Sequence, residues 1–189
     1  MIGATGKLSA GAAPRRRNLF VWSENFAQSY WGKVGTSITA NAITAPFGQA
    51  DGSKLVESSA SSNHYFALGS LPAAVYTASF YAKADGRSVL LVQFQDGSHY
   101  PYVSFDLSAG TATPALGASG TITAVGGGWY RCSITANTLT ATCAIYAYLI
   151  NGAQSYQGDG VSGIYLWGAQ LVPGLRLTPY LATAGAARP

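Results

Sequence analysis

Apolar and polar residues alternate along most of the chain in short runs that are typical of β-strands. Residues 88–95 alternate with Leu90, Val92 and Phe94 on one side, and residues 129–135 place Cys132 between polar neighbours. Such a two-residue period predicts strands with one face in a core. No window repeats apolar residues at the three- and four-residue spacing of an amphipathic helix.

About ten runs of this kind follow one another at intervals of roughly 8–12 residues, with Gly, Asp-Gly and Asn-Gly turn signals between them. We expect strands within residues 20–22, 30–34, 37–42, 53–58, 65–68, 75–82, 88–95, 102–106, 120–125, 129–135, 142–150 and 163–171. The spacing predicts an all-β sandwich or barrel, and the absence of a long internal repeat argues against a propeller or solenoid. We therefore predict one β-sandwich over residues 18–183, with an arm at 1–17 and a tail at 184–189.

The positive charge is concentrated at the start of the chain. Four of the 11 Lys and Arg residues precede Asn18, which leaves seven to balance the seven Asp and Glu residues of the body. These four are Lys7, Arg15, Arg16 and Arg17. A neutral body argues against a nucleic-acid-binding face. We expect the basic arm either to dock on an acidic neighbour in an assembly or to be a solvated charge run.

Two further features bear on the environment of the protein. The first residues lack the apolar run of a signal peptide, and no stretch approaches the length of a membrane-spanning helix, so we expect neither secretion by that route nor membrane insertion. Cys132 and Cys143 lie in strand-like runs without zinc-site spacing. We expect buried free thiols, with a cross-strand disulfide as the alternative.

Several motifs, in order along the chain, resemble one family. They include NLFVWSENF from Asn18, SFYAKADGRS from Ser79, GWYRCSIT from Gly128 and YQGDGVSGIYLWGAQL from Tyr156. Over residues 18–183 the chain resembles the jelly-roll modules, related to carbohydrate-binding modules, of bacteriophage tail-fibre, tail-tip and head-fibre or spike proteins. This resemblance implies a single jelly-roll β-sandwich.

The resemblance also implies a function. It implies a non-enzymatic module on the virion surface, in a tail or head appendage assembled in the host cytoplasm, that binds host cell-surface polysaccharide. The arm at residues 1–17 would attach it to other virion proteins, and the module would form a trimer or higher homo-oligomer. The alternative is a purely structural virion component, a decoration or assembly protein, with no glycan ligand.

Sugars are held by exposed aromatic rings and a few orienting polar groups. The candidates of this kind are His99, Tyr100 and Tyr102 in one loop, Tyr156, and Tyr148 with Gln154 nearby. Tyr146 and Tyr148 share one face of a predicted strand. If that face is outward, it forms an aromatic platform, and if it is inward, it is core.

Metal-binding and catalytic signals are sparse. Because structural Ca²⁺ is common in the jelly rolls that the chain resembles, Asp51, Asp106 and Asp159 are weak calcium candidates; solvated turn carboxylates are the simpler interpretation. No other cofactor is indicated. Asp96, Ser98 and His99 are too close in sequence for the usual catalytic triad, and no spacing indicates a glycosidase pair of carboxylates. We expect no enzymatic activity.

Overall fold

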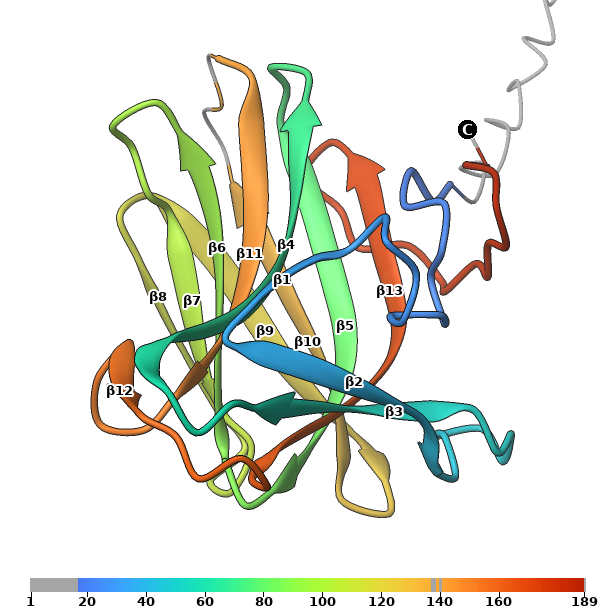
Figure 1. Ribbon diagram of the computed structural model, residues 1–189. Helices are drawn as coiled ribbons and strands as arrows, with labels where there is room; N and C mark the ends of the chain where they lie inside the picture. Colours follow the sequence, from blue (N-terminus) through green and yellow to red (C-terminus); the bar gives the residue numbers. More distant parts are fainter. Residues whose placement is uncertain (1–16, 137–138, 140, 189) are drawn as a thin grey trace, which may run out of the picture.

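The computed structural model describes residues 17–136, 139 and 141–188, and this part of the chain is all-β (Figure 1). It contains no α-helix, and therefore none that could cross a membrane. The strands are β1 (Gly32–Val34), β2 (Thr36–Ile43), β3 (Gly52–Glu57), β4 (Ser61–Leu71), β5 (Tyr76–Asp85), β6 (Val89–Asp96), β7 (Tyr102–Asp106), β8 (Thr111–Ala115), β9 (Ala118–Gly126), β10 (Trp129–Ala136), β11 (Cys143–Ile150), β12 (Ser155–Gln157) and β13 (Gly163–Pro173).

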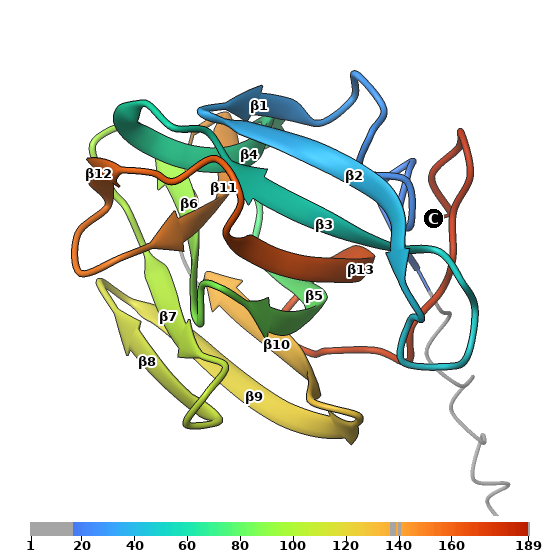
Figure 2. The ribbon, with the colours of Figure 1, turned by 60° about the horizontal axis from the view of Figure 1, so that its bottom comes forward.

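The strands form two sheets packed face to face (Figures 1 and 2). The first sheet has the order β1-β4-β11-β6-β7-β8, with β12 paired to β4. The second sheet has the order β2-β3-β13-β5-β10-β9. Two packed sheets with a shared interior make a β-sandwich, as the alternation predicted.

Strand pairing defines the sandwich as a jelly roll. Eight strands pair as four nested antiparallel ribbons: β6 with β7, β5 with β10, β4 with β11, and β3 with β13. Each ribbon encloses the previous one along the chain, and successive ribbons alternate between the two sheets. This double-sheet arrangement of eight strands is the jelly-roll topology. The predicted fold class is confirmed.

The core lies between the sheets and is rich in aromatic rings. Phe66 and Phe80 come from opposite sheets, and their ring centroids are 5.7 Å apart. Phe26 and Trp31 follow the N-terminal segment and pack on Phe66 at 5.5 and 5.4 Å. Burial of such rings supplies most of the hydrophobic stabilisation of a core. The predicted alternation appears in β6, where every second side chain is buried.

Both chain ends of the described structure lie together, beside the second sheet (Figure 1). Asn18 and Arg188 exchange two backbone hydrogen bonds of 2.8 Å, and the amide of Gly185 donates to the carbonyl of Val21. The expected strand at residues 20–22 is therefore a set of isolated bridges to the C-terminal segment. Residues 184–188, expected as a tail, pack along the body in the same way.

The two cysteines are free and buried, as predicted. Cys132 lies on β10 and Cys143 on β11, in different sheets. Burial raises the pKa of both thiols, that of Cys143 to about 11, with the Asp96 carboxylate adding to the effect. Both therefore stay protonated at neutral pH and are poor nucleophiles.

Candidate functional site

Three tyrosine side chains gather on the outer face of the first sheet. Tyr146 and Tyr148 alternate along β11 with residues that lie in the core, and Tyr65 on β4 is directly opposite Tyr148. The Tyr65 ring centroid is 4.9 Å from that of Tyr148 and 5.3 Å from that of Tyr146, and the two β11 rings stack at 5.7 Å. The sequence did not decide whether Tyr146 and Tyr148 face the core or the outside, and the structure places them on the outer face of the sheet. We call these three residues the tyrosine cluster.

Tyr148 is the buried member of the tyrosine cluster. It is 6% exposed, whereas Tyr65 and Tyr146 are half-buried and present their rings to solvent. Burial raises the pKa of Tyr148 to about 12, the two neighbouring tyrosines add to this, and a hydrogen bond with the Gln154 side chain opposes it. At neutral pH the Tyr148 hydroxyl is therefore protonated.

The face continues from the tyrosine cluster across β6 and β7. Tyr146 is in register with Gln93 on β6, and Gln93 is in register with Tyr102 on β7. Neighbouring strands lie roughly 4.8 Å apart, so Tyr102 is about 10 Å from Tyr146 along this row. Tyr102, a predicted site residue, thus shares the face, and Gln93 places an amide between the two aromatic positions.

A shallow pocket of about 220 Å³ adjoins Tyr146. It brings together the outward amide of Gln95, the hydroxyl groups of Ser70 and Thr142, and the tyrosine ring. The lining residues are Ser70, Gln95, Gly97, Thr142, Cys143, Ala144 and Tyr146. The predicted site did not include Tyr65, Gln93, Gln95 or Ser70. Alternation along β6 indicates an outward Gln93 and Gln95, but only the register shows that they lie beside Tyr146.

His99 and Tyr100 lie in the turn between β6 and β7. The backbones of Asp96 and His99 exchange two hydrogen bonds of 2.9 Å, which close this turn. Tyr100 is 39% exposed and His99 is half-buried. Both residues therefore lie just before Tyr102, the residue at which β7 begins. Asp96 is itself buried, and its carboxylate accepts a hydrogen bond of 2.8 Å from the amide of Ala141.

Tyr156, another predicted site residue, is engaged inside the molecule. Its hydroxyl donates to Oε2 of Glu57 over 2.7 Å. Its ring lies 4.6 Å from the His64 ring and 5.6 Å from the Arg87 guanidinium. Its ring therefore belongs to an internal network, whereas Gln154, two residues earlier, reaches the tyrosine cluster.

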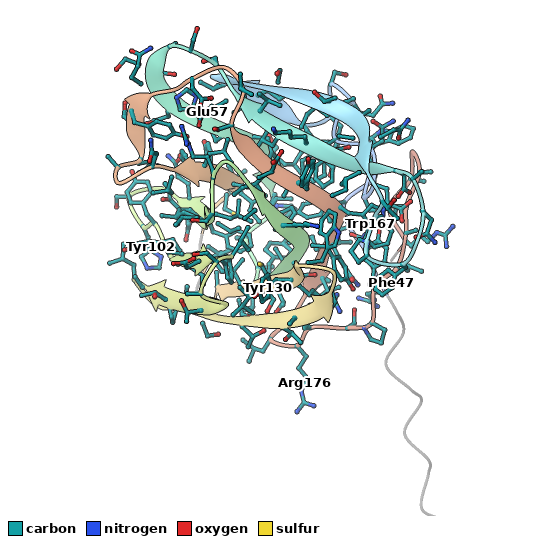
Figure 3. The ribbon with its side chains drawn as sticks, turned by 90° about the horizontal axis from the view of Figure 1, so that it is seen from below. Phe47, Glu57, Tyr102, Tyr130, Trp167 and Arg176 are labelled. Carbon is teal, nitrogen blue, oxygen red and sulfur yellow. The ribbon has the colours of Figure 1, made fainter. Side chains whose placement is uncertain are left out.

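The network around Glu57 is a buried ion pair at one end of the sandwich (Figure 3). The Glu57 side chain is fully buried and accepts two hydrogen bonds from Arg87, of 2.8 and 2.6 Å. It also accepts the amide of Asp159 at 2.8 Å. All four groups that contact this carboxylate are donors, which is what a buried charge requires.

The three calcium candidates lie on separate elements and have protein partners. Asp51 accepts the indole N–H of Trp167 at 2.9 Å. Asp106 and Asp159 each cap a turn by accepting hydrogen bonds from a serine side chain and from backbone amides. These hydrogen bonds lower the pKa of both carboxyl groups. Within the described ranges, no three His, Cys, Asp or Glu residues group together as a metal site would need.

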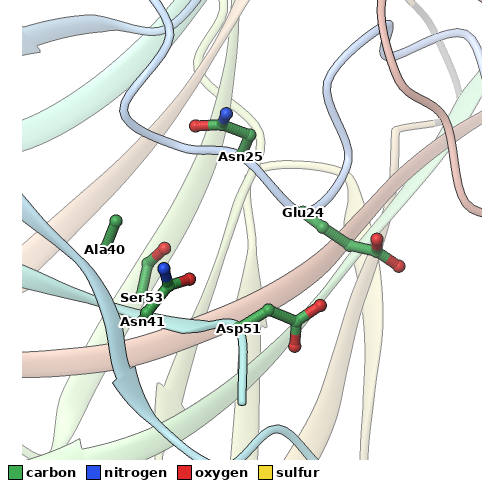
Figure 4. Close-up of a pocket in the computed structure, with 6 residues that line it drawn as sticks. All are labelled: Glu24, Asn25, Ala40, Asn41, Asp51 and Ser53. Atoms are coloured by element: carbon green, nitrogen blue, oxygen red, sulfur yellow. The ribbon is translucent and has the colours of Figure 1, made fainter. Parts of the chain in front are cut away.

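Asp51 also lines a pocket of about 260 Å³ with Glu24 (Figure 4). The pocket lies between the Ser23–Asn25 loop, a bulge in β2 and the start of β3; Asn25, Ala40, Asn41 and Ser53 complete its lining. Burial raises the pKa of Glu24, and Asp51 adds to this, while a hydrogen bond from the Tyr180 hydroxyl opposes it. The sequence did not predict this convergence of two carboxylates.

The outer face of the second sheet differs from the first because it is covered. Tyr81, Trp129 and Trp167 form a second aromatic cluster that is almost fully buried. Phe47 packs on Tyr81 and Trp167 at 5.5 Å and is itself 56% exposed. Figure 3 shows Phe47 and Trp167 on the side of the molecule away from Tyr102.

The C-terminal segment helps to cover this second face. The Arg131 side chain donates to the carbonyl of Thr178 at 2.9 Å, and the ring of Tyr180 lies 4.8 Å from that of Trp167. Arg17, the first described residue, is exposed, and its carbonyl accepts a hydrogen bond of 2.8 Å from Gln170 on β13. The other predicted arm residues, Lys7, Arg15 and Arg16, lie outside the described residues.

Comparisons with solved structures find neighbours at low sequence identity. No family model and no curated protein matches the chain. One similar structure is TmCBM61 in complex with β-1,4-galactotriose, at 12% identity over 85% of this chain and 100% of that one, with a TM-score of 0.45. Another is the enzymatically active domain of tailspike protein 4 of bacteriophage CBA120, at 15% identity and a TM-score of 0.46.

A third similar structure comprises the CBM22-1 and GH10 modules of Clostridium thermocellum xylanase 10B complexed with xylohexaose, at 13% identity and a TM-score of 0.45. The chain is covered over 82% and 84% in the tailspike and xylanase comparisons, but it spans only 21% and 28% of those two chains. These similar structures are thus chains that contain carbohydrate-binding modules and a domain of a phage tailspike.

Proposed function

We propose that this protein is a non-enzymatic glycan-binding module and that the outer face of its first sheet holds the glycan. The observation that carries the proposal is the tyrosine cluster, which is solvent-facing, adjoins a polar pocket and continues to Tyr102.

The chemistry of the face suits a sugar chain. Tyrosine rings pack against the apolar faces of sugar rings, while Gln93, Gln95 and Gln154 supply amides that donate to and accept from hydroxyl groups. The face carries no charged side chain among the residues that define it, which suits a neutral ligand. Its aromatic positions are spread over about 10 Å across strands, so an extended oligosaccharide fits better than a single sugar.

We further propose that the module belongs to a phage particle, in a tail or head appendage, where residues 1–17 attach it to other virion proteins and copies assemble as a homo-oligomer. The sequence motifs support this placement. The arrangement of the described chain is consistent with it, because Arg17 and the C-terminal segment lie at the second sheet. Attachment through that end would leave the tyrosine cluster free to meet a host surface.

A hydrolase is the second candidate, because Glu24 and Asp51 converge in one pocket and burial keeps the pKa of Glu24 above its usual range. Paired carboxylates with separated proton affinities are the machinery of glycoside hydrolysis. We favour binding alone because this pocket is at the β2 edge of the second sheet, away from the tyrosine cluster. Both carboxylates also accept hydrogen bonds within the protein, Asp51 from the Trp167 indole and Glu24 from the Tyr180 hydroxyl.

The proposal is tested by binding of the full chain to an array of bacterial surface polysaccharides, followed by calorimetry with the best oligosaccharide. Tyr65→Ala/Tyr146→Ala should weaken binding by at least about fivefold, since each lost stacking ring removes roughly 0.5–1.5 kcal/mol and tenfold corresponds to about 1.4 kcal/mol. Phe47→Ala is the matched control, because it removes a ring that is even more exposed, on the opposite face. It should leave the affinity unchanged.

Two outcomes would overturn the proposal. If neither the full chain nor its native oligomer binds any glycan, the purely structural virion role becomes the better account. If the array glycans are shortened during incubation and Glu24→Gln abolishes this, the protein is a hydrolase.

A further inference from the structure

The pocket beside Tyr146 is built on a β-bulge in β4. The register between β4 and β11 shifts by one residue here, so that Ala144 alone lies opposite both Gly69 and Ser70. One extra residue in one strand of an antiparallel pair is a β-bulge, and bulges change the direction in which a side chain points. The Ser70 side chain lines the pocket. The bulge therefore supplies one wall of the pocket.

Ser70 has a backbone conformation that serine rarely adopts. Its φ is +63°, in the left-handed region, where the Cβ atom of an L-residue lies too close to the following carbonyl oxygen. Glycine has no Cβ and adopts this conformation freely. A glycine, Gly69, directly precedes Ser70 but does not have a positive φ. The strained conformation thus falls on the residue that carries a side chain.

Core packing explains the bulge but not the serine. Leu68 and Leu71 both pack in the core, and this spacing of three residues between inward side chains needs one extra residue in the strand. Glycine or asparagine at position 70 would adopt the same conformation more easily. The Ser70 side chain is exposed, and its hydroxyl has no hydrogen bond to another residue that the structure describes. Strained residues of this kind cluster at ligand-binding and other functional sites.

Ala144 forms a small floor between two polar walls of the pocket. It lies opposite the bulge on β4 and in register with Gln95 on β6. Neighbouring strands lie roughly 4.8 Å apart, so the backbones of Ser70 and Gln95 are about 10 Å apart across the alanine. Tyr146, the next outward residue of β11, and Thr142 complete the polar and aromatic lining. All lining residues are uncharged, which suits a neutral ligand.

We propose that Ser70 is a specificity-determining residue of the glycan site, which holds one neutral sugar ring over Ala144 and against the Tyr146 ring. Hydroxyl groups on opposite edges of this sugar bond to the Ser70 hydroxyl and the Gln95 amide, each of which can donate and accept. The inference rests on the proposed function and assigns a sugar to one pocket of that face. The strained serine is retained because its hydroxyl binds the ligand, although glycine would make the fold more stable.

Two substitutions of Ser70 in the full chain separate its hydroxyl from its backbone. Ser70→Gly and Ser70→Ala both remove the hydroxyl, but only glycine relieves the strained φ. Calorimetry with the best oligosaccharide of the array should show affinity about fivefold weaker in both, the effect of losing one hydrogen bond. The urea midpoint of unfolding should rise in Ser70→Gly and stay near that of the wild type in Ser70→Ala. Wild-type affinity in either variant, or a lower midpoint in Ser70→Gly, overturns the inference.

Ala144→Leu tests the floor of the pocket. Leucine there occupies the space of the sugar ring, so affinity should fall by about tenfold or more, since inserting extra atoms into a filled site is unfavourable. Ala124→Leu on β9 is the matched control, because it makes the same enlargement at an exposed position of the second sheet, and it should bind as the wild type does. Full affinity in Ala144→Leu overturns the inference but leaves the proposed function standing. A wild type that binds no glycan overturns the proposed function, and this inference with it.

Discussion

At the residue scale, Tyr148 couples the tyrosine cluster to the stability of the fold. Burial raises the pKa of its hydroxyl from the ordinary 10 to about 12. A folded pKa above the unfolded one means that the neutral hydroxyl stabilises the fold below pH 10, and that this contribution disappears as pH rises through about 12. The wild type should therefore lose about 2 kcal/mol more than Tyr148→Phe between pH 9 and pH 12.

Urea unfolding at a series of pH values measures this difference. Absorbance at alkaline pH follows the ionisation of the tyrosines in parallel. Identical pH dependence in the wild type and Tyr148→Phe would mean that Tyr148 is solvated, and the cluster would then be looser than described.

Glu57 gives a second prediction at this scale. Its carboxylate is fully buried and neutralises Arg87, so Glu57→Gln leaves a largely buried guanidinium with only the more distant, half-exposed carboxylate of Asp159 at 3.5 Å. The free energy of unfolding should fall by about 3 kcal/mol, measured by urea denaturation. Asp85→Asn is the control, because the ion pair of Asp85 with Lys54 is partly exposed. It should cost no more than about 1 kcal/mol. Equal losses of stability in the two variants would contradict the view that burial makes the Glu57–Arg87 ion pair the more important one.

At the element scale, the turn between β8 and β9 is strained. Leu116 and Gly117 both have positive φ, of 52° and 82°, as in the type I′ turns that favour Asn-Gly. Leucine pays about 1–2 kcal/mol in this conformation, and its side chain is 57% exposed, so it regains little by packing. Leu116→Asn should raise the free energy of unfolding by about 1 kcal/mol, measured by thermal and urea unfolding. A loss of stability would show that Leu116 makes contacts that matter more than its backbone strain.

Elements with one buried face could be predicted from the sequence, and the others could not. β6 and β11 alternate clearly because one side of each meets the core. β8 is an edge strand of exposed residues with Pro114 inside it, which is a poor strand signal, and it was missed. β12 was missed because three residues carry no period. An edge strand or a short bridging strand forms because a neighbouring strand pairs with it, and its own sequence pattern does not show this.

The sequence predicted which types of residue form the candidate site better than it predicted where they lie on the sheets. The two-residue period groups Tyr146 with Tyr148 but does not say which side of β11 faces solvent. The register of β11 with β4 and β6, set by residues far away in the sequence, brings Tyr65 and Gln93 beside them. Tyr156 was chosen for its loop-like surroundings, yet its hydroxyl bonds to a buried carboxylate.

At the scale of the whole molecule, the two outer faces of the sandwich have different roles. The second sheet is covered by the C-terminal segment and by the loop that carries Phe47, and its aromatic rings are sealed beneath them. The first sheet leaves the rings of Tyr65 and Tyr146 partly exposed to solvent and surrounds them with amides and hydroxyls. One face closes the fold where the chain ends meet, and the opposite face is available for a ligand.

The most direct measurement of this account is the mapping of backbone amide chemical shifts while the best-binding oligosaccharide is titrated into the ¹⁵N-labelled full chain. The account predicts that shifts change around residues 63–67, 91–95 and 144–148, with smaller changes near Tyr102 and Gln154. It predicts no change around Phe47 or Trp167. Changes centred on the second sheet or on the pocket of Glu24 and Asp51 would contradict the assignment of the first sheet as the glycan-binding face.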